Sequence, residues 1–161
     1  MNKLTGRKTI IGHKKEDKGQ YDIPLYTHGA YSGAMMIRKS VIEQTGMLPR
    51  NFFIYFDDSD VSARILKNGY KILYQPKAVV YNRASLLPSE KSAINVYYRT
   101  RNRILFMRRN SNLLQFSIFL SFFFFLTIPA TTTKFLIKRQ FTHLQSFFKG
   151  IWWNVKMRAA A

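Results

Sequence analysis

An aromatic run without charged residues, near the C-terminus, constrains this chain more than any other feature. The run extends from Asn110 to Thr133, and six of its residues between positions 116 and 125 are phenylalanine. A helix that crosses a bilayer needs about 20 mainly apolar residues, so the run is just long enough to do so. So many phenylalanines are also difficult to bury in a small domain. The run therefore predicts membrane association, with a buried core helix as the alternative interpretation.

The distribution of charge supports the membrane interpretation. Residues 97–161 carry 11 Lys or Arg and no Asp or Glu, whereas residues 1–96 carry 15 basic and all 8 acidic residues. Basic residues flank the run on both sides, which favours a hairpin or an interfacial helix over one simple crossing. Aromatic and basic residues then alternate at roughly helical spacing, which is typical of helices at an anionic membrane surface. We expect a protein on the cytoplasmic face of the cell membrane, either peripheral or inserted as a hairpin.

Composition argues against several other classes of protein. The chain has no cysteine, which excludes disulfides, thiolate metal sites and cysteine nucleophiles. With 47% hydrophobic residues it is too apolar to be disordered, despite a net charge of +18. A nucleic-acid binder would use similar basic and aromatic residues but would not need the phenylalanine-rich run, so we expect no nucleic-acid partner. A small basic membrane-associated structural or interaction protein without catalytic activity stays open as an alternative.

In residues 1–96 the helices are predicted from the residues that begin or end a helix, and not from long periodic patterns. One short helix is predicted over residues 39–45, where Gly46 would end it. A second is predicted from Ser59 to Asn68, with Asp57 or Asp58 as its N-cap and Gly69 after its end.

Strand signals follow the second helix, so these residues indicate a mixed α/β region. Alternation predicts a strand over residues 70–74, and Pro76 separates it from a second strand over residues 78–81. A long helix is then predicted from an N-cap at Ser89, with Glu90 in its first turn, to about Arg109.

One acidic cluster is a candidate for chemistry. Asp57, Asp58 and Asp60 follow directly after the aromatic residues 52–56. The unpaired amides at a helix N-terminus stabilise one carboxylate easily, but neighbouring like charges repel. Carboxylates at a loop-to-helix junction can act as a general base or bind a divalent cation. A helix cap with solvated neighbours is the alternative interpretation.

Several short segments, in order and spacing, together carry a family resemblance. They are Gly33-Ala-Met-Met-Ile-Arg-Lys39, Gly46-Met-Leu-Pro49, Phe53-Ile-Tyr-Phe-Asp-Asp-Ser-Asp60, Ala63-Arg-Ile-Leu-Lys-Asn-Gly-Tyr70, Pro76-Lys-Ala-Val-Val-Tyr81, Tyr97-Tyr-Arg-Thr-Arg-Asn102 and Phe147-Phe-Lys-Gly-Ile151. The chain thereby resembles family 2 glycosyltransferases of the GT-A fold, especially the bacterial rhamnosyltransferase-like enzymes. The resemblance implies that residues 1–96 are the C-terminal half of a Rossmann-like catalytic domain. Residues 97–161 would be a basic, aromatic, helical membrane-associating region.

The resemblance also implies an activity and a set of site residues. Such enzymes transfer a sugar from a nucleotide sugar, with inversion, to a glycan or to a membrane-proximal or lipid-linked acceptor in cell-surface polysaccharide synthesis. Asp58 corresponds to their catalytic base, which takes the proton of the acceptor hydroxyl. The substrate-binding residues implied by the resemblance are Asp57, Asp60, Arg64, Gly33 and Ala34.

The expected cofactor of the complete family enzyme is a divalent metal, Mg²⁺ or Mn²⁺, on the donor diphosphate. Many relatives have histidine where Asn82 stands, and an amide oxygen suits Mg²⁺ better than a transition metal. The family's nucleotide-binding half, with its acidic metal motif, has no counterpart here. We therefore assign no metal ligand, and we expect the chain to be a fragment or split gene product that is inactive alone.

Overall fold

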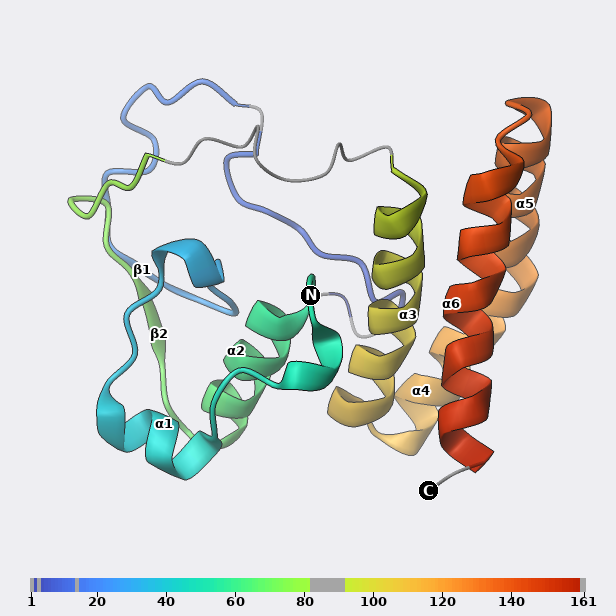
Figure 1. Cartoon of the computed structure of the whole chain (residues 1–161). Helices are drawn as coiled ribbons and strands as arrows, with labels where there is room; N and C mark the ends of the chain where they lie inside the picture. The colour runs from blue at the N-terminus through green and yellow to red at the C-terminus, as the bar shows by residue number, and fades with distance from the viewer. Residues whose placement is uncertain (1, 3, 14, 82–91, 160–161) are drawn as a thin grey trace. The chain divides into compact units, whose positions relative to one another are not determined.

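The computed structural model describes residues 2, 4–13, 15–81 and 92–159, and helices dominate it (Figure 1). The chain forms two compact units. The first contains residues 8–53 and 57–83, and the second contains residues 2–7, 54–56 and 84–161. Among the described residues the only sheet has two strands, so the α/β expectation is confirmed in part: the fold is rich in helices and has a small sheet.

The sheet of the first unit pairs β1 (Leu25–Thr27) with β2 (Ile72–Tyr74) in antiparallel register, Leu25 opposite Tyr74. The strand predicted over residues 70–74 is therefore present but shorter. The strand predicted over residues 78–81 is wrong, because that segment has no regular structure. A turn closed by Ala78 N–H and the Gln75 carbonyl comes first, and Val79, Val80 and Tyr81 are then exposed without a strand partner among the described residues.

The two helices of the first unit end at the glycine residues from which their ends were predicted. α1 (Lys39–Thr45) stops at Gly46, whose φ is 79° and whose N–H donates to the Ile42 carbonyl. α2 (Asp57–Lys67) ends in a Schellman motif at Gly69, with a φ of 82°. The short turns η1 (Ser32–Ala34) and η2 (Arg50–Phe52) precede α1 and α2 respectively. The core between these elements contains Val41, Val61 and Ile65, with Met35, Ile37, Tyr70 and Ile72 packed around them.

The second unit is a helical bundle. Its elements are α3 (Ala93–Asn110), α4 (Leu113–Phe122), the π-helical turn η4 (Phe123–Thr127), α5 (Ile128–Ile137) and α6 (Phe141–Ala159). The predicted long helix begins later than expected: Ser92 is its N-cap and accepts the Asn95 N–H, whereas Ser89 and Glu90 lie outside the described residues. α4 opens with a capping box formed by Asn112 and Gln115.

The contact between α3 and α6 organises this bundle (Figure 1). The two helices run in the same direction, because Gly150 lies against Tyr97 and Asn154 lies against Arg101. A Cβ atom on Gly150 would be 2.8 Å from the Tyr97 carbonyl oxygen, so only glycine allows this approach. α5 and α6 form a tight hairpin, in which Arg139 adopts a φ of 52° in a Schellman motif.

Candidate functional site

Asp58 lies in the first turn of α2, and only one of its carboxylate oxygens is engaged. Oδ1 accepts hydrogen bonds from the Ser59 N–H at 2.7 Å and the Ser59 hydroxyl at 3.0 Å, and it pairs with Lys8 Nζ at 2.8 Å. Within the part of the chain that the structure describes, no residue donates to Oδ2. The side chain keeps 18% of its surface exposed. The carboxylate is thus fixed through one oxygen and open to a proton donor through the other.

The neighbouring acids differ from Asp58 in their surroundings. α2 begins at Asp57, so Asp57 and Asp58 lie within the first turn and neither precedes the helix as the predicted N-cap. Asp57 is half-buried. Asp60 is almost completely buried and pairs with Arg64 Nε at 3.1 Å. The three acids therefore do not form one exposed cluster.

Arg64 connects α2 to the loop that follows α1. Besides Asp60, its guanidinium donates to the carbonyls of Thr45, Gly46 and Met47, the last two at 2.9 and 2.7 Å. Both terminal nitrogens of the guanidinium therefore donate to backbone carbonyls of this loop. Asp60 and Arg64 thus brace the helix in this structure, which was the alternative to substrate binding for both residues, and their role in binding substrate stays a prediction.

Gly33 and Ala34 lie in the exposed turn η1. The segment leading to them is tied to α2, because the Ala30 N–H donates to the Ser62 hydroxyl at 3.3 Å. That hydroxyl in turn donates to the Asp58 carbonyl at 2.7 Å. The structure thus links the glycine segment to the start of α2, although no bond among the described residues joins Gly33 or Ala34 to the Asp58 carboxylate.

The aromatic turn before α2 has an unusual backbone. Phe53, Tyr55 and Phe56 have φ angles of 61°, 64° and 70°, a region that bulky residues rarely adopt. Each such residue costs about 1–3 kcal/mol and persists only where surrounding contacts impose it. The acidic end of α2 therefore follows directly on a strained segment.

Asn102 holds this turn, and no role in the site was predicted for it. It is fully buried in α3, and its Nδ2 donates to the Ile54 carbonyl at 2.6 Å and the Tyr55 carbonyl at 3.0 Å. Arg101 Nε donates to Asn102 Oδ1 at 2.8 Å, which fixes the orientation of the amide. The signal that could have identified it was an asparagine between two arginines, directly before the apolar residues 104–107.

The arginines of α3 rest on aromatic rings. Arg99 lies 4.7 Å from the Tyr55 ring centre, and Arg101 lies 4.5 Å from that of Trp153. Arg103 lies over the Phe119 and Phe123 rings of α4 and η4, at 5.6 and 5.5 Å. Burial, and secondarily the nearby Arg7, lower the pKa of Arg103 to about 10, so it stays charged at neutral pH. Aromatic faces therefore stabilise these cations within the bundle.

The C-terminal helices present a large apolar surface. The helix Leu113–Ile137 is long and apolar enough to cross a membrane, by length and composition alone, and only 11% of its most apolar window is buried. Exposed large residues include Phe124, Phe125, Leu126, Leu136 and Ile137 on this helix, and Phe141, Phe148, Trp152 and Val155 on α6. This surface agrees with the predicted membrane-associating region.

The described residues contain no group of three or more His, Asp or Glu side chains that could hold a metal ion, and Asn82 lies outside them. The Mg²⁺ or Mn²⁺ expected of the complete family enzyme stays a prediction. Comparison with protein-family models, with curated proteins and with solved structures finds no match to this chain. The resemblance to glycosyltransferases stays a prediction.

Proposed function

We propose that this chain is a membrane-associated protein of the inverting glycosyltransferase type, in which Asp58 is the general base. The geometry of Asp58 carries the proposal, because Oδ1 is fixed by Ser59 and Lys8 while Oδ2 is open to an acceptor hydroxyl. Asp58 Oδ2 takes the hydroxyl proton as the acceptor oxygen bonds to the anomeric carbon of a nucleotide sugar. The bond from that carbon to the nucleoside diphosphate breaks in the same step, which inverts the configuration.

The strained turn supports this assignment. Strain of this kind is concentrated at functional sites, and here Asn102 and the aromatic residues maintain it directly before Asp57. We also propose that the first unit corresponds to part of a GT-A domain. We assign the donor diphosphate and its metal to the nucleotide-binding half that the resemblance implies for the complete family enzyme.

The second unit would attach the chain to the membrane. Its exposed apolar helices and its basic residues fit the cytoplasmic, anionic leaflet, where a lipid-linked or membrane-proximal acceptor lies. Attachment to the membrane would raise the concentration of such an acceptor around the chain.

One observation favours a second function. The ion pair between Lys8 and Asp58 gives the carboxylate a partner within the chain, which is also what a purely structural acid would have. The alternative is therefore a membrane-associated interaction protein without catalytic activity.

The proposal is tested by replacing Asp58 and measuring sugar transfer in membranes of the cells that produce the protein. Membranes from producing cells that carry the wild-type protein, Asp58→Asn or Glu43→Gln would be incubated with labelled nucleotide sugars, and transfer to the lipid and glycan fractions measured. We expect Asp58→Asn to lower transfer by about 10²–10⁴-fold, because the acceptor loses its base. Glu43, an exposed acid of α1 paired with Lys39, is the matched control and should leave transfer unchanged. Equal transfer by Asp58→Asn and wild type would favour the non-catalytic alternative.

A further inference from the structure

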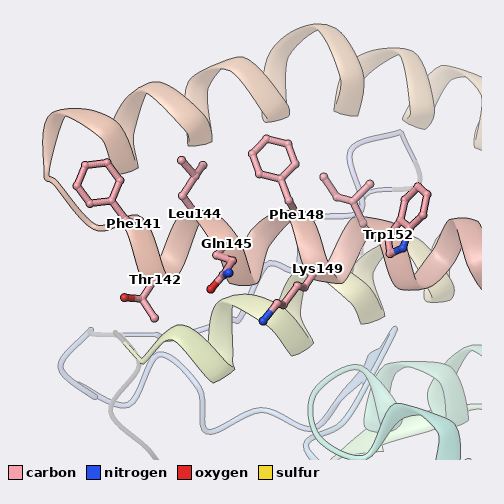
Figure 2. Close-up of a pocket in the computed structure, with 8 residues that line it drawn as sticks. Phe141, Thr142, Leu144, Gln145, Phe148, Lys149 and Trp152 are labelled. Carbon is pink, nitrogen blue, oxygen red and sulfur yellow. The ribbon is translucent and has the colours of Figure 1, made fainter.

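An open groove of about 860 Å³ runs along α6, on a surface to which the proposed activity gives no role. Figure 2 shows its two edges: Phe141, Leu144 and Phe148 point to one side of the helix, and Gln145 and Lys149 to the other. Trp152 continues the apolar edge, and Lys149 is the one charged residue among those lining the groove. The groove is therefore amphipathic across its width.

The apolar edge is exposed. Phe141, Phe148 and Trp152 keep 64%, 44% and 59% of their surfaces accessible. These exposed aromatic residues recur at helical spacing, and α6 packs against α5, the C-terminal part of the apolar helix Leu113–Ile137. The apolar surface of that helix therefore continues onto α6, as in helices that associate with membranes. The ligand that this edge fits is a hydrocarbon chain.

Basic residues determine how α6 lies at a bilayer. Lys138 and Arg139 precede the helix, and Lys156 lies near its end. Insertion of either end into hydrocarbon would bury these charges at high cost. α6 therefore lies along the interface, with the apolar edge toward the acyl chains and the polar edge toward the headgroups.

We propose that this groove binds an anionic phospholipid of the bilayer, with its phosphate at Lys149 and one acyl chain against Phe148 and Trp152. Charge complementarity supports an anionic headgroup, since residues 97–161 contain no Asp or Glu that would repel it. The inference rests on the membrane association in the proposed function, but it does not depend on glycosyl transfer.

The headgroup contact is tested with the full chain and two kinds of vesicle, phosphatidylcholine alone and an equal mixture with phosphatidylglycerol. Lys149→Gln should weaken binding to the mixed vesicles by about fivefold, the effect of one lysine at an anionic surface. Lys156→Gln, which removes an exposed lysine of the same helix outside the groove, should weaken it less. Neither change should alter binding to phosphatidylcholine.

The acyl-chain contact is tested by fluorescence with phospholipids that carry bromine on their chains. These lipids should quench part of the emission of the wild-type protein, and Trp152→Phe should remove that part and leave the emission of Trp153. Phe148→Ser should reduce the quenching, whereas Ile137→Ser, at an exposed apolar residue outside the groove, should not.

The outcomes of these experiments distinguish a lipid site at this groove from membrane association in general. Equal weakening by Lys149→Gln and Lys156→Gln, or bound protein whose Trp152 is not quenched, would overturn the lipid site and leave membrane association standing. Absence of binding to either kind of vesicle would overturn both. Sugar transfer is measured separately, so its loss or retention bears on Asp58 alone.

Discussion

Lys8 is the charged partner of the proposed base. Its Nζ lies 2.8 Å from Asp58 Oδ1, and 30% of the lysine side chain is exposed. Exposed ion pairs contribute little to stability, about 0–1 kcal/mol, because water screens them. Ser59 also holds Oδ1, through its N–H and its hydroxyl.

We therefore expect Lys8→Met to change the free energy of unfolding by less than about 1 kcal/mol and to leave sugar transfer close to wild type, because Ser59 still fixes Oδ1. Thermal unfolding and the membrane transfer assay measure the two effects. Lys15→Met, at an exposed lysine, is the control for loss of one charge. A loss of transfer with Lys8→Met alone would show that Lys8 orients Asp58 or binds substrate.

Asn102 acts on the same region through the backbone. Its Nδ2 satisfies two carbonyls of the strained turn, those of Ile54 and Tyr55. Asn102→Ala leaves both carbonyls without this donor and opens a cavity at a fully buried position. A loss of about 2–4 kcal/mol in the free energy of unfolding is expected, because each unsatisfied buried group costs about 1–3 kcal/mol.

Chemical denaturation of the detergent-solubilised protein measures this loss. Asn110→Ala is the matched control, since Asn110 also lies in α3 but its Nδ2 donates to a carbonyl of its own helix, that of Phe106. An equal effect of both substitutions would contradict the special role of Asn102.

At the scale of elements, Gly150 sets the distance between α3 and α6. A Cβ atom there would meet backbone atoms, the Tyr97 carbonyl oxygen at 2.8 Å and the Arg101 nitrogen at 3.1 Å. Backbone cannot move aside as a side chain can, so the two helices would have to separate.

Gly150→Ala should therefore lower the free energy of unfolding by about 1–3 kcal/mol, although alanine favours helix by about 1 kcal/mol over glycine. Ser117→Ala, on the exposed face of α4, makes the helix-favouring change without a steric conflict and should be neutral or slightly stabilising. Thermal unfolding of the two variants provides the comparison. A stabilised Gly150→Ala protein would show that the helices are free to adjust.

Helix ends were predictable from the sequence because the signal is local. Gly46 and Gly69 adopt the positive φ angles that a C-terminal glycine permits, and α1 and α2 stop there. The choice of Ser92 over Ser89 as the cap of α3 was not predictable, because either serine can accept the bond.

The strands and the site geometry depended on contacts distant in sequence. β1 pairs with β2 across more than forty residues, and strands of three residues are too short for a periodic pattern. The acidic residues of the candidate site were identifiable by type. The bond from Asn102 to the turn before them was not, because it joins residues almost fifty positions apart.

At the scale of the whole molecule, electrostatic attraction and the transfer of apolar surface would both bind the chain to a membrane. Residues 97–161 have a net charge of +11, and the same segment exposes the apolar helix Leu113–Ile137. Electrostatic attraction weakens with salt, whereas the transfer of apolar surface into the interface does not.

We therefore expect binding to anionic vesicles to fall with rising salt to the level seen for neutral vesicles, and to persist there at about 1 M salt, where screening extends only about 3 Å. Co-sedimentation over a salt series measures both levels. Phe124→Ser together with Phe125→Ser, at two exposed rings, should lower the salt-resistant level and leave the salt-dependent part unchanged. A nucleic-acid binder would lose its ligand steeply over the same series. Complete release from vesicles at high salt would therefore contradict apolar insertion and leave charge as the only membrane contact of this chain.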